Sequence, residues 1–305
     1  QALTELIISR ADGNPFYIAE MVRVLIEDGV ILCTEDAWQL VPERLLQVRL
    51  PTSLTGVVQA RLDGLSNEER LLLQKAAIIG RTFWDLPLAT LLPEQSAEQI
   101  AAQLTQLRRR GLLTLTPSSP LPGGHEYSFQ SAILHEVAYE SLLKRQRRSD
   151  HKQVATWLVQ NSTEWADTIA AIIADHFERA EESALAAQWY QRAAERAARQ
   201  YAGDETLRLL ERALALTAPD DLQTRYELLR AQARQHEQRA ERSSQQACLQ
   251  ALQAAAEALQ AHSSPGRGQP VPLAEAAIFQ ARFASDTGYY PNAILNAQRA
   301  IALTR

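Results

Sequence analysis

The stretch "TGYYPNAILNAQRAIAL", residues 287–303, places small residues and an aromatic residue at fixed intervals. Gly288 is followed by Tyr290, Ala293 and Ala300, and the two alanines are seven residues apart. Seven residues are about two turns of an α-helix, so these alanines lie on one helix face. Small side chains on one face let a second helix approach closely, and the aromatic ring fills the remaining gap. The spacing therefore predicts paired helices that pack through small residues.

The same interval recurs upstream of this stretch. Pairs of small residues seven positions apart are Ala186/Ala193, Thr206/Ala213, Ala247/Ala254 and Ala293/Ala300. The pattern in residues 287–303 resembles the Gly, aromatic, Ala and Ala spacing of a tetratricopeptide (TPR) repeat. We therefore expect residues 151–305 to form an α-solenoid of TPR-like helical repeats, interrupted at 263–272. Because "AIALTR" lacks the polar surface of a capping repeat, we expect the array to continue beyond residue 305.

Residues 51–150 predict three helices, then two strands, then a further helix. The first helix starts at Pro51-Thr52-Ser53, Ser66 and Glu69 form a capping box for the second, and Gly111 ends the third. The strands "LLTLTP" and "HEYSFQS" flank a loop rich in proline and glycine. This order is that of a winged-helix domain, so we expect a mainly α fold with wing strands.

The N-terminal residues predict a turn, an amphipathic helix and a hairpin. Asp12, Gly13 and Asn14 are turn formers, and Pro15 suits the first helical turn because its missing N–H costs nothing there. Gly29 is the expected helix stop. We assign residues 1–30 to the end of a helical domain and residues 31–50 to a short β-hairpin and linker.

The composition bounds the function. The 305 residues suffice for about two or three domains, and a hydrophobic content of 46% is typical of soluble globular proteins. The net charge of −5 argues against a protein that coats nucleic acid by bulk charge. Cys33 and Cys248 match no zinc or redox spacing, and no apolar run is long enough to span a bilayer. We expect a cytoplasmic protein with no membrane partner.

The known catalytic and metal motifs do not match. None of the three lysines follows a glycine, so the phosphate-binding loop G-x-x-x-x-G-K-[ST] is missing from the sequence. His135 and Glu136 begin a zinc-like H-E-x-x-H pattern, but Tyr139 replaces its second histidine. We interpret the other histidines as surface or capping residues: His125, His151, His176, His236 and His262. We predict no catalytic residue, no metal site and no enzymatic activity for this chain alone.

Two basic segments raise the question of DNA binding. Arg108, Arg109 and Arg110 end the third predicted helix, where a DNA-binding winged helix carries its reading residues. Cationic residues also favour a helix C-terminus for electrostatic reasons, and the chain as a whole is acidic. We interpret residues 144–152, "KRQRRSDHK", as a solvated segment at the turn into the repeats. DNA binding through this chain is the less favoured interpretation.

Four stretches in order resemble the lid, winged-helix and repeat region of bacterial signalling STAND ATPases. These proteins carry an AAA-type nucleotide-binding module ahead of TPR repeats, often fused to an adenylate cyclase, kinase or LuxR-type DNA-binding domain. The resemblance covers about residues 1–216. The stretches are "RADGNPFYIAEMVRVLIEDGV" (10–30), "LPTSLTGVVQARLDGLSNEERLLLQKAAIIGRTF" (50–83), "YSFQSAILHEVAYESLLKRQRRSDHK" (127–152) and "IADHFERAEESALAAQWYQRAAERAARQYAGDETLRLLERALAL" (173–216).

The resemblance implies a nucleotide switch. In this family ADP lies between the ATPase core, the lid and the winged helix and keeps the protein closed, and ATP opens it. The resemblance implies that Gly13, Asn14 and Pro15 contact the base of the nucleotide. It also places Ser131 where relatives carry a histidine that bonds the ADP phosphate, although Ser131 can equally cap the helix that follows. His135 is a neighbour that can make the same contact.

These contacts require a full-length protein whose ATPase core lies upstream of residue 1, so we expect ATP or ADP there and no cofactor on this segment alone. The expected function is a regulatory, sensor and scaffold segment of a signal-transduction ATPase. Its expected partners are the upstream nucleotide-binding domain, an unidentified protein or small-molecule inducer on the repeats, and further copies of itself. The alternative is a TPR adaptor or transcriptional regulator with a DNA-binding winged helix. Nothing in these 305 residues distinguishes a cyclase, a kinase and a DNA-binding domain as the output domain.

Overall fold

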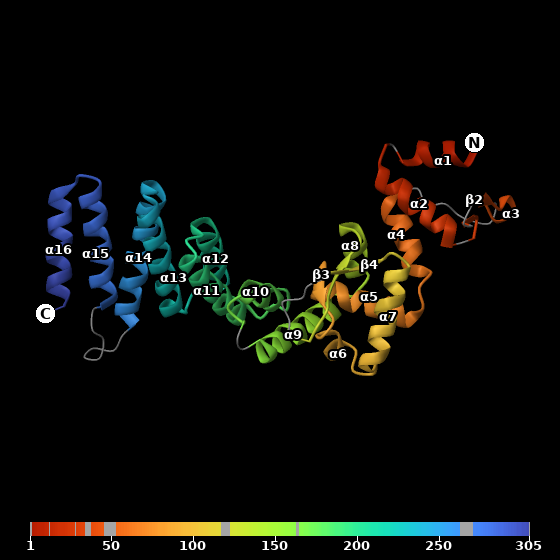
Figure 1. The fold of residues 1–305 in the computed structure, drawn as a ribbon. Coiled ribbons are helices and arrows are strands. Elements are labelled where there is room, and N and C mark those ends of the chain that lie inside the picture. Colours follow the sequence, from red (N-terminus) through yellow and green to blue (C-terminus); the bar gives the residue numbers. More distant parts are fainter. Residues whose placement is uncertain are drawn as a thin grey trace. The chain divides into compact units, whose positions relative to one another are not determined.

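The chain is mainly helical and carries two small antiparallel sheets (Figure 1). The computed structural model describes residues 2–11, 13–27, 29–33, 38–45, 53–116, 123–162, 165–262 and 271–304. The chain divides into two compact units, Gln1–Val154 and Ala155–Arg305. The mainly α class expected from the sequence is confirmed.

The first unit begins with two helices and a hairpin. These elements are α1 (Ala2–Ala11), α2 (Pro15–Glu27), β1 (Ile31–Cys33), β2 (Trp38–Leu40) and α3 (Pro42–Leu45). Gly29 follows α2 with a left-handed φ of 66°, and Val30 N–H bonds to Leu25 C=O at 2.8 Å. The predicted glycine stop and the antiparallel hairpin are both confirmed. Residues 34–37, between the strands, lie outside the described residues, and α3 is a short helix that the sequence did not predict.

The remainder of this unit combines helices with a three-stranded sheet. In order its elements are α4 (Leu54–Asp63), α5 (Asn67–Ile79), β3 (Thr82–Trp84), α6 (Leu88–Leu91), α7 (Ala97–Arg109), β4 (Leu113–Thr116), β5 (Glu126–Phe129) and α8 (Ala132–Glu140). The antiparallel strands have the order β3-β5-β4, so β4 is an edge strand. One face of the sheet is buried, with Phe83 stacked on Tyr127 at a ring-centroid distance of 5.7 Å.

Side-chain caps explain where these helices begin. Ser66 and Glu69 form the predicted capping box at the start of α5. A second capping box, made by Ser96 and Gln99, starts α7. The predicted stop at Gly111 is confirmed by its φ of 67°.

The structure corrects the predicted order of elements. The sequence predicts three helices followed by two strands, whereas β3 and α6 lie between the second and third of those helices. Both elements are too short to show a period: β3 has three residues and α6 has four. Most of the predicted loop between β4 and β5, residues 117–122, lies outside the described part of the chain.

The second unit is built from consecutive helices. Helix α9 (Lys144–Asn161) runs from the first unit into the second. The helices that follow are α10 (Ala170–Arg179), α11 (Ser183–Arg199), α12 (Gly203–Leu216), α13 (Leu222–Arg239), α14 (Arg242–His262), α15 (Val271–Asp286) and α16 (Tyr290–Leu303). Each of the helices α10 to α16 packs against the next along the chain (Figure 1). Of the predicted interruption at 263–272, residues 263–270 lie outside the described residues and the last two begin α15.

Four turns between these helices share one backbone feature. Glu181, Tyr201, Ala240 and Gly288 have left-handed φ angles of 60°, 59°, 55° and 83°. In every case the next residue donates its N–H to the carbonyl five residues before it, at 2.8–3.2 Å. This is a left-handed C-cap, which reverses the chain sharply after a helix. The repeated turn sets a common register for the helical hairpins.

This register shows that one predicted pair of small residues is wrong. Positions five and twelve residues after the left-handed residue are Ala186/Ala193, Thr206/Ala213, Gln245/Leu252 and Ala293/Ala300. In α14 the predicted Ala247 and Ala254 are exposed, whereas Gln245 and Leu252 are 1% and 0% exposed. Helix α14 is rich in alanine on all sides, so alanine spacing there does not identify the packed face.

The basic segment 144–152 is mostly exposed, as expected, but it forms the first half of the helix α9 and is not a turn. Asp150 is 1% exposed and accepts a 2.6 Å hydrogen bond from Lys75 Nζ on α5. His151 and His176 are buried as well, so their interpretation as surface residues is wrong. An i, i+3 or i, i+4 apolar neighbour on each of these helices would have indicated the burial.

Candidate functional site

The turn between α1 and α2 holds the first three residues predicted to form a site. Gly13 has a φ of 77°, and a Cβ added there would meet no atom within 4 Å. Asn14 Oδ1 accepts the N–H of Tyr17 at 3.3 Å and so caps α2, and Pro15 is the first helical residue. All three residues are exposed. The predicted turn is confirmed, and its contact with a nucleotide stays a prediction.

Ser131, the fourth predicted site residue, lies at the start of α8. Its hydroxyl accepts the N–H of Leu134 at 3.2 Å, so Ser131 is the N-cap of this helix. His135 lies one turn further, with Nε2 3.0 Å from the Ala77 carbonyl on α5 and its ring edge-on to Phe129. The His135 ring is therefore engaged with the core of the first unit. The capping role of Ser131 is confirmed, and its role toward a phosphate is untested.

The structure does not gather the predicted residues into one cavity. The turn lies at the start of α2 and Ser131 at the start of α8, and α4 packs against both helices. Neither site lines any of the three cavities described next. Both predicted sites lie at the start of a helix. The Gly13–Pro15 turn is exposed and Ser131 is half-buried.

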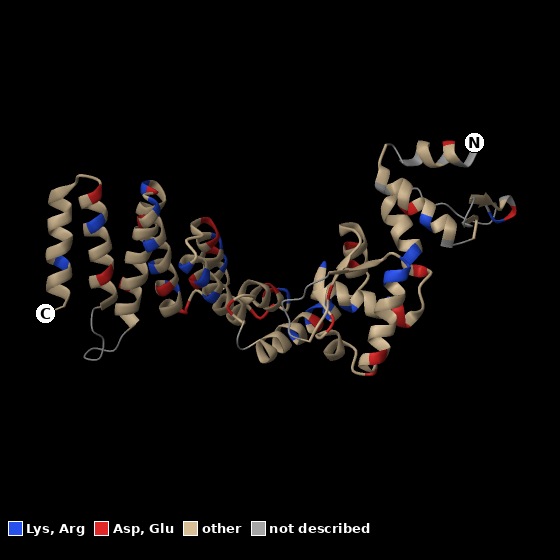
Figure 2. Cartoon of the chain, viewed as in Figure 1, with Lys and Arg blue, Asp and Glu red and all other residues tan. Residues whose placement is uncertain are grey.

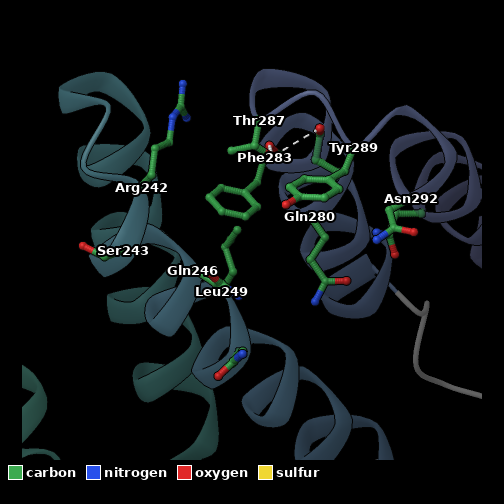
Figure 3. Close-up of a pocket in the computed structure, with 12 residues that line it drawn as sticks. Arg242, Ser243, Gln246, Leu249, Gln280, Phe283, Thr287, Tyr289 and Asn292 are labelled. Carbon is green, nitrogen blue, oxygen red and sulfur yellow. Dashed lines mark hydrogen bonds between the residues drawn. The ribbon is translucent and has the colours of Figure 1, made fainter.

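The largest of these cavities lies in the repeats, between α14, α15 and α16. It has a volume of about 520 Å³. Leu249 on α14, Phe283 on α15 and Tyr289 at the N-cap of α16 line the cavity and provide an apolar wall (Figure 3). A cavity of a few hundred Å³ with an apolar wall and several polar groups is typical of a small-molecule site.

Carboxamide groups dominate the polar lining of this cavity. They belong to Gln246, Gln250, Gln280, Asn292 and Asn296. Among the described residues that line the cavity, Arg242 alone is charged. It donates to Asp286 Oδ2 at 3.2 Å and to Gln245 Oε1 at 2.9 Å, so its charge is compensated. A carboxamide both donates and accepts hydrogen bonds. The lining therefore suits an uncharged polar ligand with an apolar portion.

Sequence reasoning missed this cavity, although a signal was present. Gln246 and Gln250 are four residues apart on α14, and Asn292 and Asn296 are four residues apart on α16. Residues at this interval share a helix face. Paired carboxamides at i, i+4 on second helices of successive hairpins would have pointed to the site.

Two smaller cavities are also present. One of about 260 Å³ lies between α11, α12 and α13 and is lined by Glu195, Arg234 and Tyr201, the last of which is 96% exposed. The other, of about 410 Å³, lies in the first unit between α7 and the edge strand β4. Its lining includes Arg108 and Arg109, which the sequence singled out.

The described residues contain no group of three or more His, Cys, Asp or Glu side chains that could hold a metal. Tyr139, at the second ligand position of the zinc-like pattern, has its hydroxyl 2.9 Å from His151 Nε2. Within the same described ranges, none of the helices is both long and apolar enough to cross a membrane.

Comparisons with known proteins give limited similarity. No family model matches the chain. An uncharacterized protein of Rhizobium meliloti (strain 1021) is 29% identical over 168 residues, covering 51% of this chain and 16% of that protein. The chain thus spans about a sixth of the length of the curated relative that it matches.

Two solved structures are similar at low level. One is a signal transduction ATPase with numerous domains (STAND) with a tetratricopeptide repeat sensor, from Pyrococcus horikoshii, at a TM-score of 0.35 and 9% identity; the match covers 99% of this chain and 50% of that chain. The other is BtubC (BKLC) from P. vanneervenii, at a TM-score of 0.27 and 12% identity, covering 78% and 91%. At these TM-scores the description of the fold rests on the turns and register of this chain itself.

Proposed function

We propose that this chain is the regulatory and sensor segment of a nucleotide-switched signalling ATPase of the STAND type. In this proposal a winged-helix domain stabilises the ADP-bound closed state, and TPR-like repeats bind an inducer. The observation that carries the proposal is the common register of four left-handed turns, which defines helical hairpins with a ligand-sized cavity. A binding function for the repeats follows from that cavity.

The order of elements in the first unit supports the winged-helix interpretation. A winged helix has a helix, a short strand, two more helices and two wing strands. The order α5-β3-α6-α7-β4-β5 and the antiparallel pairing of β5 with both other strands fit this plan. Helix α4 then precedes the domain and connects it to α2.

The hairpins α11/α12, α13/α14 and α15/α16 support the TPR-like interpretation. Each turns at a left-handed residue and buries the residues twelve positions later. The cavity between α14, α15 and α16 is the proposed inducer site. Its neutral carboxamide lining and its wall of Leu249, Phe283 and Tyr289 favour an uncharged polar inducer with an aromatic or aliphatic part.

The nucleotide chemistry is assigned to the full-length protein. The sequence lacks a phosphate-binding loop, so ATP or ADP would be held by an upstream nucleotide-binding domain. Gly13, Asn14, Pro15 and Ser131 would contribute contacts from this segment. Exposed turn residues at the start of α2 are accessible to such a domain.

A nucleotide off-rate measurement on the full-length protein tests this proposal. Ser131→His places an imidazole at a position where relatives bond the ADP phosphate, so we expect slower ADP release, by about tenfold or more. Ser131→Asn retains an N-cap side chain and is the matched control, with an unchanged off-rate. An equal off-rate in Ser131→His and wild type would mean that α8 does not contact the phosphate. The 1–305 chain alone should release no phosphate from ATP.

The alternative function, a DNA-binding adaptor, is favoured by one observation. Arg108 and Arg109 are exposed at the end of α7, and neither guanidinium forms a hydrogen bond or ion pair with another described residue. Titration of a labelled DNA duplex at two salt concentrations tests this alternative, since phosphate contacts weaken steeply with salt. Binding at micromolar concentration or tighter would favour it.

A further inference from the structure

The cleft between α7 and β4 combines unpaired positive charge with a sheet edge that no other described strand pairs with. Its volume is about 410 Å³, and its lining comes from Thr105, Arg108 and Arg109 on α7 and from residues 113–115 on β4. Figure 2 shows basic residues at the end of α7 nearer α4 and acidic residues at the other end. The cleft therefore lies at the C-terminal end of α7, which carries its basic side chains.

The hydrogen-bond register shows which groups of β4 face outward. Gln130 N–H bonds to Leu112 C=O at 3.0 Å, so residues 112, 114 and 116 point their backbone groups toward β5. On the other side of β5, Phe129 N–H bonds to Arg81 C=O and Asp85 N–H bonds to His125 C=O, which confirms the alternation. The N–H and C=O groups of Leu113 and Leu115 therefore point away from β5, toward the outer edge of the sheet, and both residues line the cleft.

Such an edge is a template for another strand. An extended peptide can pair with alternating outward N–H and C=O groups, a mode of recognition known as β-strand addition. Duplex DNA cannot use this alternation, because a phosphate backbone accepts hydrogen bonds but donates none. The two guanidinium groups beside the edge add a preference for negative charge.

We propose that the α7–β4 cleft binds an extended acidic peptide segment of a partner protein, which adds a strand to β4 and places carboxylates on Arg108 and Arg109. The row of hydroxyls on the open sheet face, Thr82, Ser128 and Thr114, continues beside the added strand. Thr82 Oγ1 and Ser128 Oγ lie 3.0 Å apart, and Thr114 Oγ1 donates to Ser128 C=O at 3.3 Å. Thr82 and Thr114 are exposed and Ser128 is partly exposed, so this row of hydroxyls faces solvent.

Fluorescence anisotropy with the 1–305 chain tests the proposal. The probe is a labelled peptide of alternating Thr and Glu, and the comparison peptide alternates Thr and Lys. We expect the acidic probe to bind, the basic peptide not to bind, and the affinity to fall as salt increases. The double variant Arg108→Glu/Arg109→Glu should lose about tenfold or more in affinity. Arg145→Glu, an exposed arginine on α9, makes the same type of charge change outside the cleft and should leave binding unchanged.

A second variant tests strand addition separately from charge. Leu115→Pro removes an outward N–H from an edge strand, where proline is tolerated, so the thermal midpoint should change little while binding is lost. Leu115→Val keeps the N–H and should bind like wild type. Binding that survives both Leu115→Pro and the arginine reversal would overturn the proposal, as would failure of the acidic peptide to bind wild type. Tighter binding of a DNA duplex than of the acidic peptide, abolished by the arginine reversal, would assign the cleft to nucleic acid and also overturn it.

Discussion

Arg61 of α4 and Glu20 of α2 form an ion pair in which the two side chains are only 2% and 4% exposed. Through Nη2 the same guanidinium donates to the Arg110 carbonyl, at the end of α7, at 2.9 Å. Glu20 also accepts a hydrogen bond from Arg23 at 2.8 Å. One buried guanidinium thus connects the helix that follows the Gly13 turn with the helix that borders the β4 cleft.

Breaking this pair should destabilise the first unit strongly. Arg61→Met leaves the buried Glu20 carboxylate with only its contact to the partly exposed Arg23, which should cost up to about 3–5 kcal/mol. Adding Glu20→Leu removes the buried carboxylate and should recover most of the loss. Hydrogen exchange across α2 and α4 measures the effect. Arg23→Met is the control, because Arg23 is 38% exposed and its loss leaves the buried Arg61–Glu20 pair intact, so it should cost clearly less than Arg61→Met. Equal effects of Arg61→Met and Arg23→Met would contradict this prediction.

Substitutions at the left-handed turns should change stability in opposite directions. Ala240 has a φ of 55°, a conformation that costs a residue with a Cβ about 1–2 kcal/mol. Ala240→Gly should therefore stabilise the repeats. The gain should be only a few tenths to about 1 kcal/mol, because glycine also raises the entropy of the unfolded chain, which offsets part of it. Gly288→Ala, at a φ of 83° with open space around it, should destabilise by about 1 kcal/mol. Urea unfolding monitored by circular dichroism checks both signs, and two changes of the same sign would rule out the shared turn.

Added bulk should distinguish the two possible registers of α14. Ala256 is fully buried, so Ala256→Leu should cost about 1–3 kcal/mol through overpacking. Ala247→Leu and Ala254→Leu lie on the exposed side and should change stability by less than about 0.5 kcal/mol. Ala300→Leu on α16 should resemble Ala256→Leu, while half-buried Ala293 should tolerate leucine better. A large loss for Ala254→Leu would restore the register read from alanine spacing.

Local signals predicted the ends of elements well. The stops at Gly29 and Gly111, the capping box at Ser66 and the cap at Ser131 depend on a few neighbouring residues, so the sequence carries the whole cause. The packed face of α14 could not be predicted from such local signals. Alanines occur on all sides of this helix, and the turn at Ala240 determines which side is buried.

Tertiary pairing explains what the sequence could not show. Strand β3 has three residues and is stable because Phe83 packs on Tyr127, more than forty positions away. Burial of Asp150 likewise depends on Lys75 from a distant helix. The repeat cavity forms where three helices meet, so its carboxamides lie together only through the tertiary packing of those helices. The predicted turn at Gly13–Pro15 needed no tertiary information and was correct as a turn.

Cys248 of α14 should behave as an unreactive core thiol. Its side chain is buried, and Sγ donates to the Leu229 carbonyl at 3.4 Å. Burial raises the pKa of the Cys248 thiol from its ordinary 9.0 to about 11, since an apolar environment disfavours the thiolate. In a Cys33→Ser background at pH 8, alkylation of the native chain should therefore be at least about tenfold slower than in denaturant.

The raised pKa of Cys248 also predicts the direction in which the stability of the repeats changes with pH. The unfolded thiol loses its proton at a lower pH than the folded one, so the contribution of Cys248 is complete below about pH 8.5. It is lost as the pH rises from about 9 to about 11, because the unfolded state then binds fewer protons. Cys248→Ser keeps a donor for Leu229 and does not titrate, so the difference in melting temperature between the two proteins should shrink or reverse over that interval. A constant difference, or alkylation at equal rates in native and denatured protein, would show that the thiol is accessible and not part of the core.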